Sequence, residues 1–555
     1  MWGASSQSLP FCTTMSAQQI PTNTNILVIG GGPSGSFAAA ALAREGHEVT
    51  LLERDHFPRY HIGESMLPSC RPFMRFIGVE EKVKNFGFCV KVGAALKFDQ
   101  KKREGYTDFI NPDPNHAAWN VTRADFDELL LRNASENNVK VFEGVSVNAL
   151  KFSPTNDKQP VAAEWKSDDG KTGTINFNWL VDASGRTGIM STKYLKNRKF
   201  NKALRSVAYW GYWTGANMYA PGTSRENATW LEALTDESGW AWFIPLTGKV
   251  SVGIVLKEEA AKAKKAAFTG PNANADFYHA QLKLVPGVTN LLGSAKFTTE
   301  VMSAGDYSYS SNQHAGPHYR IVGDAGAFID PFFSSGVHLA FGSGLNAAAT
   351  ISASIRGDCT EEQAISFHTQ KTSTSYTRFL LVVLSAYRQI THQSVAVLAD
   401  VDEDNYDRAF DFIRPGMFLF PRTKSRSRLS RTQLSRASPI RTRLSRRICC
   451  RAQWTSASTP SGLTDPEMHE DVAKKVDPAL LTDDAPLMSV KDAKALAGDD
   501  EDIEMVLRRV NSRKALEPLN WQPNFRGETF ENLYIRLERG NLGLSRADVA
   551  PTVEV

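Results

Sequence analysis

The hydrophobic pattern of the chain opens with a short apolar run, NILVIGGG at residues 25–32, which is rich in β-branched side chains and ends in glycines. The small-residue stretch PSGSFAAAALAREG follows with helical character, and HEVTLLER then forms a second apolar run. β-Branched runs of this length favour strands, whereas alanine-rich stretches favour helices. The order predicts a strand, a helix and a second strand, which is the βαβ unit of a parallel sheet.

Later segments extend this pattern and place a second sheet in the middle of the chain. Residues 124–138 have helical spacing and precede the strand-like VKVFEGV, and alternation returns in TINFNWLVDASG. Aromatic and β-branched residues dominate between residues 205 and 256, which predicts antiparallel strands. Residues 319–355 then supply another strand, a glycine-rich loop and a long small-residue helix. We therefore predict an α/β fold whose first domain is discontinuous in sequence.

Composition narrows the class of protein. A chain of 555 residues exceeds what one hydrophobic core usually fills, so we expect two or more packed subdomains. No apolar run approaches the roughly 18–20 residues that cross a bilayer, and the N-terminus lacks the pattern of a secretory signal. The six cysteines have no metal-ligand spacing. We expect a cytoplasmic protein with no transmembrane segment, no metal site and no disulfides.

The positive charge of the chain comes from one segment. Residues 422–451 contain 11 Lys or Arg and no Asp or Glu, so the rest of the chain carries a net charge of −7 against +4 for the whole. A basic pI that arises from one Arg/Ser-rich stretch does not indicate a nucleic-acid partner. The stretch has irregular leucines and a proline in the middle, which predicts low-complexity sequence without a stable helix.

A glycine motif follows the first predicted strand and opens the first predicted helix. In the dinucleotide-binding GxGxxG pattern, glycines allow a tight turn and close approach of the backbone to a pyrophosphate at a helix N-terminus. An acidic residue ending the next strand can bind a ribose hydroxyl. The residues that fit these roles are Gly30, Gly31, Gly32, Ser34, Gly35 and Glu53. The motif alone does not distinguish FAD from NAD.

Two further segments favour FAD. Asp324 ends a predicted strand in IVGDAGAFIDPFFSSG, where a carboxylate can reach a ribityl chain and the next helix can face an isoalloxazine ring. Together with LVDASGR at residues 180–186, this segment resembles the FAD-binding motifs of the p-hydroxybenzoate hydroxylase-like flavoproteins. Three such motifs in the right order predict FAD as the cofactor.

The tryptophan pair in GWAWFIP, residues 239–245, carries a more specific resemblance. It resembles the WxWxIP motif of flavin-dependent halogenases, and PRYHIGESMLP at 58–68 resembles the strap beside their flavin. The segments GFCVKVGA, WNVTRADFD, STKYLKNR and DPFFSSG also match. The resemblance covers about residues 22–414 and resumes near LERGNLGL. In detail it is to the fungal enzymes that chlorinate phenolic polyketides, including mushroom halogenases acting on orsellinate esters of the melleolide type.

The resemblance implies a two-component reaction. A separate flavin reductase supplies FADH2, O2 converts it to a flavin hydroperoxide, and chloride attack gives hypochlorous acid that must travel to a phenolic substrate. Trp240 and Trp242, which alternation puts on one face of a strand, would wall the flavin from the substrate, although aromatic residues usually just pack. Lys91 matches the family's catalytic lysine, which forms a chloramine or hydrogen-bonds hypochlorous acid; Lys97 is the natural control. Burial would lower the pKa of Lys91.

The resemblance also implies a chloride site and further flavin contacts. Ser335 and Gly336 would hold chloride through their backbone amides, although an ordinary helix start is an alternative interpretation. Where tryptophan halogenases have a glutamate that stabilises the charged ring intermediate, this chain has Phe333, which favours a phenol over an indole. His338 has no assigned role. The remaining residues that would contact FAD are Glu64, Arg123, Asp324, Pro331 and Val337.

We predict four segments along the chain: a disordered extension at 1–21, a discontinuous FAD-binding and substrate domain at 22–414, an Arg/Ser-rich segment at 415–464, and a helical region at 465–555. Within the second segment, the FAD parts are about 22–200 and 300–356 and the substrate sheet is about 201–299. Two other functions stay open. The first is a single-component aromatic hydroxylase that reduces its own flavin with NADPH. The second is an inactive flavin-binding paralogue, because the Arg/Ser-rich segment departs from the family. This segment is a membrane-binding or nuclear-targeting patch, a functional linker or a gene-model artefact.

Overall fold

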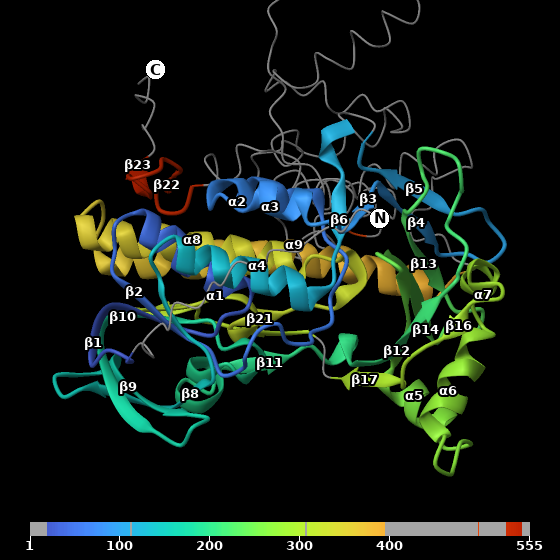
Figure 1. Ribbon diagram of the computed structural model, residues 1–555, viewed down its shortest axis with the longest axis horizontal. Coiled ribbons are helices and arrows are strands. Elements are labelled where there is room, and N and C mark those ends of the chain that lie inside the picture. Colours follow the sequence, from blue (N-terminus) through green and yellow to red (C-terminus); the bar gives the residue numbers. More distant parts are fainter. Residues whose placement is uncertain (1–18, 111–113, 306–307, 394–497, 499–528, 547–555) are drawn as a thin grey trace, which may run out of the picture.

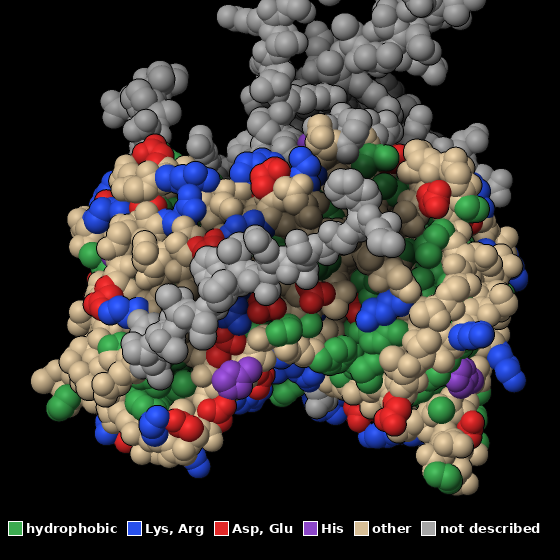
Figure 2. Space-filling model, in the orientation of Figure 1, with side chains coloured by type: hydrophobic (Ala, Val, Ile, Leu, Met, Phe, Trp, Pro, Cys, Tyr) green, Lys and Arg blue, Asp and Glu red, His purple; other side chains and the backbone are tan. Residues whose placement is uncertain are grey.

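The computed structural model describes residues 19–110, 114–305, 308–393, 498 and 529–546. The expected extension at 1–21 falls almost wholly outside these residues, and the Arg/Ser-rich segment at 415–464 falls entirely outside them. Two eight-stranded sheets form the described part, and long helices run between them (Figure 1). In Figure 2 the lower edge of the molecule is hollowed between the lobe that carries β8 and β9 and the lobe that carries α5 and α6.

The first sheet has a parallel centre, as the βαβ pattern predicts. The strand order is β19-β20-β10-β1-β2-β7, and the β8–β9 hairpin joins it through β10. Residues of β1 are buried on both faces: Ile26 and Val28 pack against the helices, and Leu27 and Ile29 pack toward the hairpin side. This double burial explains why the run is apolar without alternation. The strands are β1 Asn23–Ile29, β2 Val49–Leu52, β7 Lys140–Phe142, β8 Val145–Ser153, β9 Asn156–Ser167, β10 Thr172–Asp182, β19 Ala315–Gly316 and β20 Tyr319–Ile321.

Helices cover one face of this sheet. α1 lies between α4 and α8, and α8 packs in turn on α9, with small side chains allowing the close approach. These helices are α1 Pro33–Arg44, α4 Arg123–Glu136, α8 Gly336–Arg356 and α9 Glu361–Ile390. α9 begins beside the first sheet and ends beside the second (Figure 1), so one rigid element spans both sheets.

The second sheet contains the aromatic strands and extends beyond the expected 201–299. Two strands that precede this range extend one edge, since β4 pairs with β13 and β5 pairs with β4. Strand β17 follows the range and pairs with β12. Helices α5, α6 and α7 cover one face. The elements are β4 Gly93–Lys97, β5 Gly105–Asp108, β12 Ser206–Thr214, β13 Thr229–Ala233, β14 Gly239–Leu246, β15 Lys249–Lys257, α5 Glu258–Lys265, α6 Ala273–Leu282, α7 Pro286–Leu292, β16 Lys296–Phe297 and β17 Met302–Gly305.

Short elements connect the two sheets. The helices among them are η1 Pro68–Cys70, α2 Arg71–Phe76, α3 Glu80–Asn85, η2 Pro114–His116, η3 Gly185–Thr187, η4 Ile189–Tyr194, η5 Lys202–Leu204, η6 Gly323–Ala325 and η7 Pro331–Phe333. The short strands are β3 Cys89–Lys91, β6 Ala118–Asn120, β11 Arg198–Phe200, β18 Tyr309–Ser311 and β21 Ala327–Phe328.

The described part of the C-terminal region differs from the helical expectation. Residues 529–546 contain a hairpin of β22 Leu533–Arg536 and β23 Gly543–Arg546, which packs beside α8 (Figure 1). Its apolar side chains join the core around α1 and α8. The alternation in LYIRLERGNLGLSR, with glycines at the turn, is typical of a hairpin. Most of the expected helical region at 465–555 lies outside the described residues.

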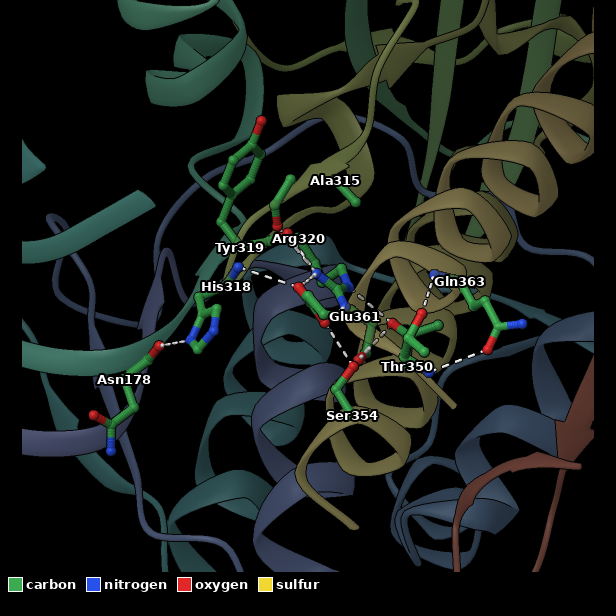
Figure 3. A network of polar contacts seen from close by, with 12 residues as sticks. Asn178, Ala315, His318, Tyr319, Arg320, Thr350, Ser354, Glu361 and Gln363 are labelled. Atoms are coloured by element: carbon green, nitrogen blue, oxygen red, sulfur yellow. Dashed lines mark hydrogen bonds and ion pairs between the residues drawn. The ribbon is translucent and has the colours of Figure 1, made fainter. Parts of the chain in front are cut away.

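A buried ion pair fixes the beginning of α9 against the sheet and α8 (Figure 3). Both terminal nitrogens of Arg320, a fully buried residue of β20, donate to the carboxylate of Glu361 at 3.0 Å, and Nε donates to Thr350 of α8 at 3.0 Å. Ser354 of α8 also donates to Glu361, at 2.6 Å. The planar guanidinium suits this bidentate contact.

Replacing Glu361 with leucine should lower the free energy of unfolding by about 2–3 kcal/mol, because Arg320 would keep its charge in the interior without a counterion. Chemical denaturation would measure the change. Glu362→Leu is the matched control, since Glu362 shares the first turn of α9 and is exposed. Equal effects of the two substitutions would mean that the ion pair contributes nothing beyond its place near the helix N-terminus.

Candidate active site

Two glycines of the GxGxxG motif are required by the packing of the chain on itself. Gly30 has φ of +104°, and a Cβ there would lie 2.2 Å from the carbonyl oxygen of Ala183. A Cβ on Gly35 would lie 1.9 Å from the carbonyl oxygen of Gly30. Neither position accepts a side chain, so the turn between β1 and α1 is as tight as the motif predicts.

Gly32 differs from its neighbours, because the protein leaves room beside it. A Cβ on Gly32 would have Arg59 Nη2 as its nearest neighbour, at 3.6 Å, which is ordinary van der Waals distance. The amide of Gly31 donates to Glu53 Oε2 at 2.5 Å, so the acidic residue that ends β2 lies against the turn. This open N-terminus of α1, flanked by a carboxylate, fits the pyrophosphate and ribose of a dinucleotide.

Asp182 ends β10, whereas Asp324 lies just beyond the neighbouring strand β20, in the short helix η6, and not at the end of the strand as predicted. The two carboxylates have different surroundings. Asp182 accepts hydrogen bonds from the amides of Ser184 and Met190, at 3.1 and 2.7 Å, and so holds the turn after β10. Loss of hydration raises the pKa of Asp324 to about 6, although Arg123 and other arginines oppose the rise. Asp324 therefore remains the better candidate for a flavin contact, with Ser34 close by on the other side of Gly323.

The segment 58–68, which we call the strap, crosses between the two sheets. Glu64 is buried and accepts a 2.6 Å hydrogen bond from the hydroxyl of Tyr212 on the second sheet. Arg123 donates to the strap carbonyls of Ile62 and Gly63 at 3.0 and 3.2 Å. Arg123 also pairs through two nitrogens with Asp127, at 2.8 and 2.9 Å. Arg123 therefore holds the backbone of the strap. The sequence did not predict this role.

The end of the strap joins Lys91 to the start of α8. Lys91 Nζ donates to the carbonyl of Met66 at 3.1 Å. Ser69, three residues later, lies 2.9 Å from His338 Nδ1 in the first turn of α8. Burial lowers the pKa of His338 to about 4, so this imidazole is neutral at physiological pH. His338, for which the sequence predicted no role, therefore links the strap to α8 through this contact.

Lys91 is buried, with 2% of its surface exposed. Its ammonium lies 5.2 Å from the ring centre of Phe109. Burial lowers the pKa of Lys91 to about 7, while the nearby Cys70 has a small opposing effect. A large fraction of the amine is therefore neutral near pH 7, as burial was expected to achieve. Lys97 has a different environment, because it is partly exposed and donates to the carbonyl of Lys102 at 2.9 Å.

The low pKa of Lys91 predicts a pH-dependent cost in stability. Between about pH 7 and pH 10 the unfolded chain holds the proton and the folded chain does not, so the contribution of this site to stability rises with pH. Replacing Lys91 with methionine, which has similar length and no charge, should raise the free energy of unfolding by about 2–3 kcal/mol at pH 7. Denaturation at pH 7 and pH 9.5 should show the gain shrinking at the higher pH. A difference that does not depend on pH would contradict the assigned pKa.

The two tryptophans lie on one face of β14, within an apolar cluster that also contains Phe332 and Phe333. Trp240 is 1% exposed and Trp242 6% exposed. The ring centre of Trp240 lies 4.9 Å from that of Phe332, in an edge-to-face arrangement. The pair therefore faces the segment that leads into α8.

Asp330 and Tyr387 hold Trp240 in place through hydrogen bonds that no sequence pattern predicted. The indole Nε1 of Trp240 donates to the hydroxyl of Tyr387 at 3.0 Å, and this hydroxyl donates to Asp330 Oδ2 at 2.6 Å. Asp330 also accepts from the amide of Phe332 at 3.0 Å. Burial raises the pKa of Asp330 to about 6. The network ties β14 and α9 to the loop before α8.

The loop before α8 combines an open position with a helix N-terminus. Pro331 begins η7, Ser334 has φ of +56°, and α8 then runs for 21 residues from Gly336. Nothing lies within 4 Å of a Cβ built on Gly336, and the buried hydroxyl of Ser335 has no hydrogen-bond partner in the described part of the chain. The amides at the start of a long helix favour an anion. Val337 is buried beside them.

The described ranges contain neither a candidate metal site nor a candidate membrane-spanning helix. No group of three or more His, Cys, Asp or Glu side chains that could hold a metal ion occurs there. Likewise, no helix in the described part of the chain is both long and apolar enough to cross a bilayer.

Comparisons with known proteins agree with this geometry. The family model described as tryptophan halogenase matches residues 25–115 and 111–396. The flavin-dependent halogenase armH1 of Armillaria mellea is 52% identical over 538 residues, which cover 95% of this chain and 99% of that protein. The flavin-dependent halogenase armH3 of the same fungus is 62% identical over 406 residues, covering 72% and 81%. The structure of the myxobacterial chondrochloren halogenase CndH matches with a TM-score of 0.60 and 29% identity, covering 72% of this chain and 91% of that one.

Proposed function

The chain belongs to the tryptophan halogenase family of flavin-dependent halogenases, and we propose that it uses FADH2, O2 and chloride to chlorinate an electron-rich phenol. Membership in this family makes it an oxidoreductase that depends on a flavin. Three further points are our proposal: the use of chloride, a phenolic substrate of polyketide or orsellinate type, and a catalytic lysine.

The observation that carries the proposal is the environment of Lys91. Lys91 is buried beside an apolar cluster and makes no ion pair within the described ranges, which is costly for a lysine, so its presence there needs a chemical reason. Its low pKa supplies an amine that can form a chloramine, and its protonated form can hydrogen-bond hypochlorous acid. Lys91 lies among the elements that connect the strap, the tryptophan face and the start of α8. It is thus placed where a halogenating species could be handed to a ring.

The residues present fit FAD. The open turn at Gly32 would hold the pyrophosphate, Glu53 the ribose, and Asp324 the ribityl chain, while Val337 and Pro331 would flank the ring. When bound and reduced, FAD supplies the electrons that let O2 oxidise chloride to hypochlorous acid. The backbone amides of Ser335 and Gly336 would hold the chloride ion without a full positive charge.

The protein itself supplies separation and orientation. Trp240 and Trp242 form an apolar wall, which the contact with Tyr387 keeps rigid. The wall would keep the substrate ring away from the flavin, so that halogenation replaces hydroxylation. Lys91 would then present the electrophilic chlorine to the ring.

The substrate class follows from Phe333. This residue is buried against Phe332, with ring centres 5.2 Å apart, so its position offers no carboxylate to stabilise a cationic ring intermediate. A phenol, and a phenolate still more, is electron-rich enough to react without that carboxylate. We therefore propose chlorination ortho or para to a phenolic hydroxyl, with a separate flavin reductase as the partner that supplies FADH2.

Mass spectrometry of a reconstituted reaction tests the proposal. Purified protein would be incubated with FAD, NADH, a flavin reductase, chloride and a panel of resorcinol and orsellinate-type phenols. A product with the chlorine isotope pattern is expected. A hydroxylated product formed with NADPH and no reductase would favour the single-component hydroxylase, and tight FAD binding with no product from any phenol would favour the inactive paralogue.

A further inference from the structure

A small group of polar side chains interrupts the apolar cluster around the tryptophan pair. Asn120 of β6, Thr229 of β13 and Ser65 of the strap are all buried, with Asn120 1% and Thr229 2% exposed. The hydroxyl of Thr229 lies 3.4 Å from that of Ser65 and 3.5 Å from Asn120 Oδ1. We call these three residues the polar group. Polar side chains in an apolar interior cost free energy unless they are hydrogen-bonded, so their presence here needs explanation.

Strand register places the polar group beside Lys91. In the β3–β6 pair, Lys91 lies opposite Ala118 and Cys89 lies opposite Asn120. Side chains of opposed residues, and of residues two apart, leave a ribbon on the same face. Lys91 and Asn120 are therefore diagonal neighbours, which are roughly 7–8 Å apart and within reach of long side chains or of one bridging ring.

The same register joins the polar group to the tryptophan face. Thr229 lies opposite Ala94 of β4, and Leu231, two residues later on the same strand, lies opposite Trp242. Ala94, Leu231 and Trp242 all belong to the apolar cluster. Thr229 therefore points into the side of the sheet that carries the tryptophans.

Asn120 has an unused donor at this place. Its Nδ2 makes no hydrogen bond in the described residues, although the atom is buried. Leaving such a donor unpaired costs about 1–3 kcal/mol, and most buried amides in proteins are paired. Thr229 meanwhile holds the Oδ1 end of the amide, so the free N–H is oriented by a neighbour. An oriented, desolvated donor is what recognition of one oxygen atom requires.

We propose that Asn120, held by Thr229 and Ser65, binds the phenolic oxygen of the substrate and thereby sets the ring beside Lys91. This inference rests on the proposed function, since it assumes an aromatic substrate with a hydroxyl group. The amide N–H stabilises the phenolate more than the neutral phenol, so the contact favours the more reactive form of the ring. It also places a carbon next to the hydroxyl nearest the lysine. Asn120 is a specificity residue for phenols over aromatic ethers.

Equilibrium binding tests this inference without turnover. Isothermal titration calorimetry of the protein loaded with oxidised FAD would use methyl orsellinate and its dimethyl ether as probes. Asn120→Leu is expected to weaken binding of the phenol about tenfold and to change binding of the ether much less, because an ether oxygen cannot ionise and accepts only weakly from the amide N–H. Thr229→Val should weaken phenol binding in the same direction and less strongly.

Thr50→Val is the matched control, because Thr50 is a buried threonine of β2 whose hydroxyl pairs with Thr24 at 3.0 Å, far from the polar group in the fold. Equal affinities of the unmodified protein, Asn120→Leu and Thr229→Val for methyl orsellinate would overturn the inference and leave the proposed function standing. Failure of the unmodified protein to bind any phenol would contradict both. Flavin content and unfolding temperature show whether a variant is misfolded. If Asn120→Leu is misfolded, the affinity of Thr229→Val for methyl orsellinate decides the test, because valine keeps the shape of threonine.

Discussion

Replacing Lys91 with alanine should reduce chlorination by at least about 1000-fold, while the enzyme continues to oxidise reduced flavin and release hydrogen peroxide. The lysine lies against the strap and Phe109, and among the residues assigned to FAD it contacts none. Its removal should therefore leave the oxygen chemistry untouched and stop transfer of chlorine to the ring. Chlorinated product would be followed by mass spectrometry, and peroxide by a coupled colour assay in the same reaction.

Lys97→Ala provides the control for this prediction. Lys97 lies six residues later on β4, is partly exposed and donates only to a backbone carbonyl. The variant should chlorinate at nearly the normal rate. If Lys91→Ala instead lost flavin oxidation together with chlorination, Lys91 would have a structural role, because its contact with Met66 also fixes the strap.

Features encoded within short segments could be predicted from the sequence. The βαβ unit and the GxGxxG turn depend on neighbouring residues, and the collisions at Gly30 and Gly35 show why no side chain is tolerated there. The shared face of Trp240 and Trp242 follows from strand alternation alone. The resemblance to flavin-dependent halogenases and the FAD-binding α/β fold are both confirmed.

Features that join distant segments could not be predicted. Strands β4 and β5 are attached to the second sheet through β13, more than 100 residues later, and no local pattern indicates that pairing. The contact of Ser69 with His338 and that of Tyr387 with Trp240 likewise join residues far apart in the chain. A single polar residue in an apolar stretch, such as Asn120 in AWNV, was the only signal for the polar group, and by itself it does not reveal a partner.

The C-terminal hairpin shows how composition can mislead. Acidic and helix-favouring residues dominate much of the region after residue 465, yet the described part is a hairpin that packs on α8. Glu45 of the chain segment after α1 accepts hydrogen bonds from the amides of Gly540 and Leu542 at 2.9 and 2.8 Å. These contacts fix where the hairpin packs, whereas its two strands follow the local alternation within residues 533–546.

Replacing Gly32 with leucine should weaken FAD binding by about 100-fold or more and leave the fold intact. A Cβ at this position meets no atom of the described residues closer than 3.6 Å, and the backbone of Gly32 lies at φ −67°, which residues other than glycine also adopt. We propose that the space beside Gly32 holds the pyrophosphate, in which case a leucine would fill the volume that the ligand needs. The ratio of bound flavin absorbance to protein, together with the unfolding temperature of the apoprotein, would measure both effects.

Gly35→Ala is the informative comparison for this last prediction. The alanine Cβ would collide with the carbonyl oxygen of Gly30, so this variant should lose both flavin and stability. The two glycines belong to one motif but are needed for different reasons. The packing of the chain requires Gly35, whereas we propose that Gly32 leaves room for the ligand. Normal flavin content in Gly32→Leu would show that the pyrophosphate does not lie at the N-terminus of α1, and the assignment of the whole nucleotide site would have to be abandoned.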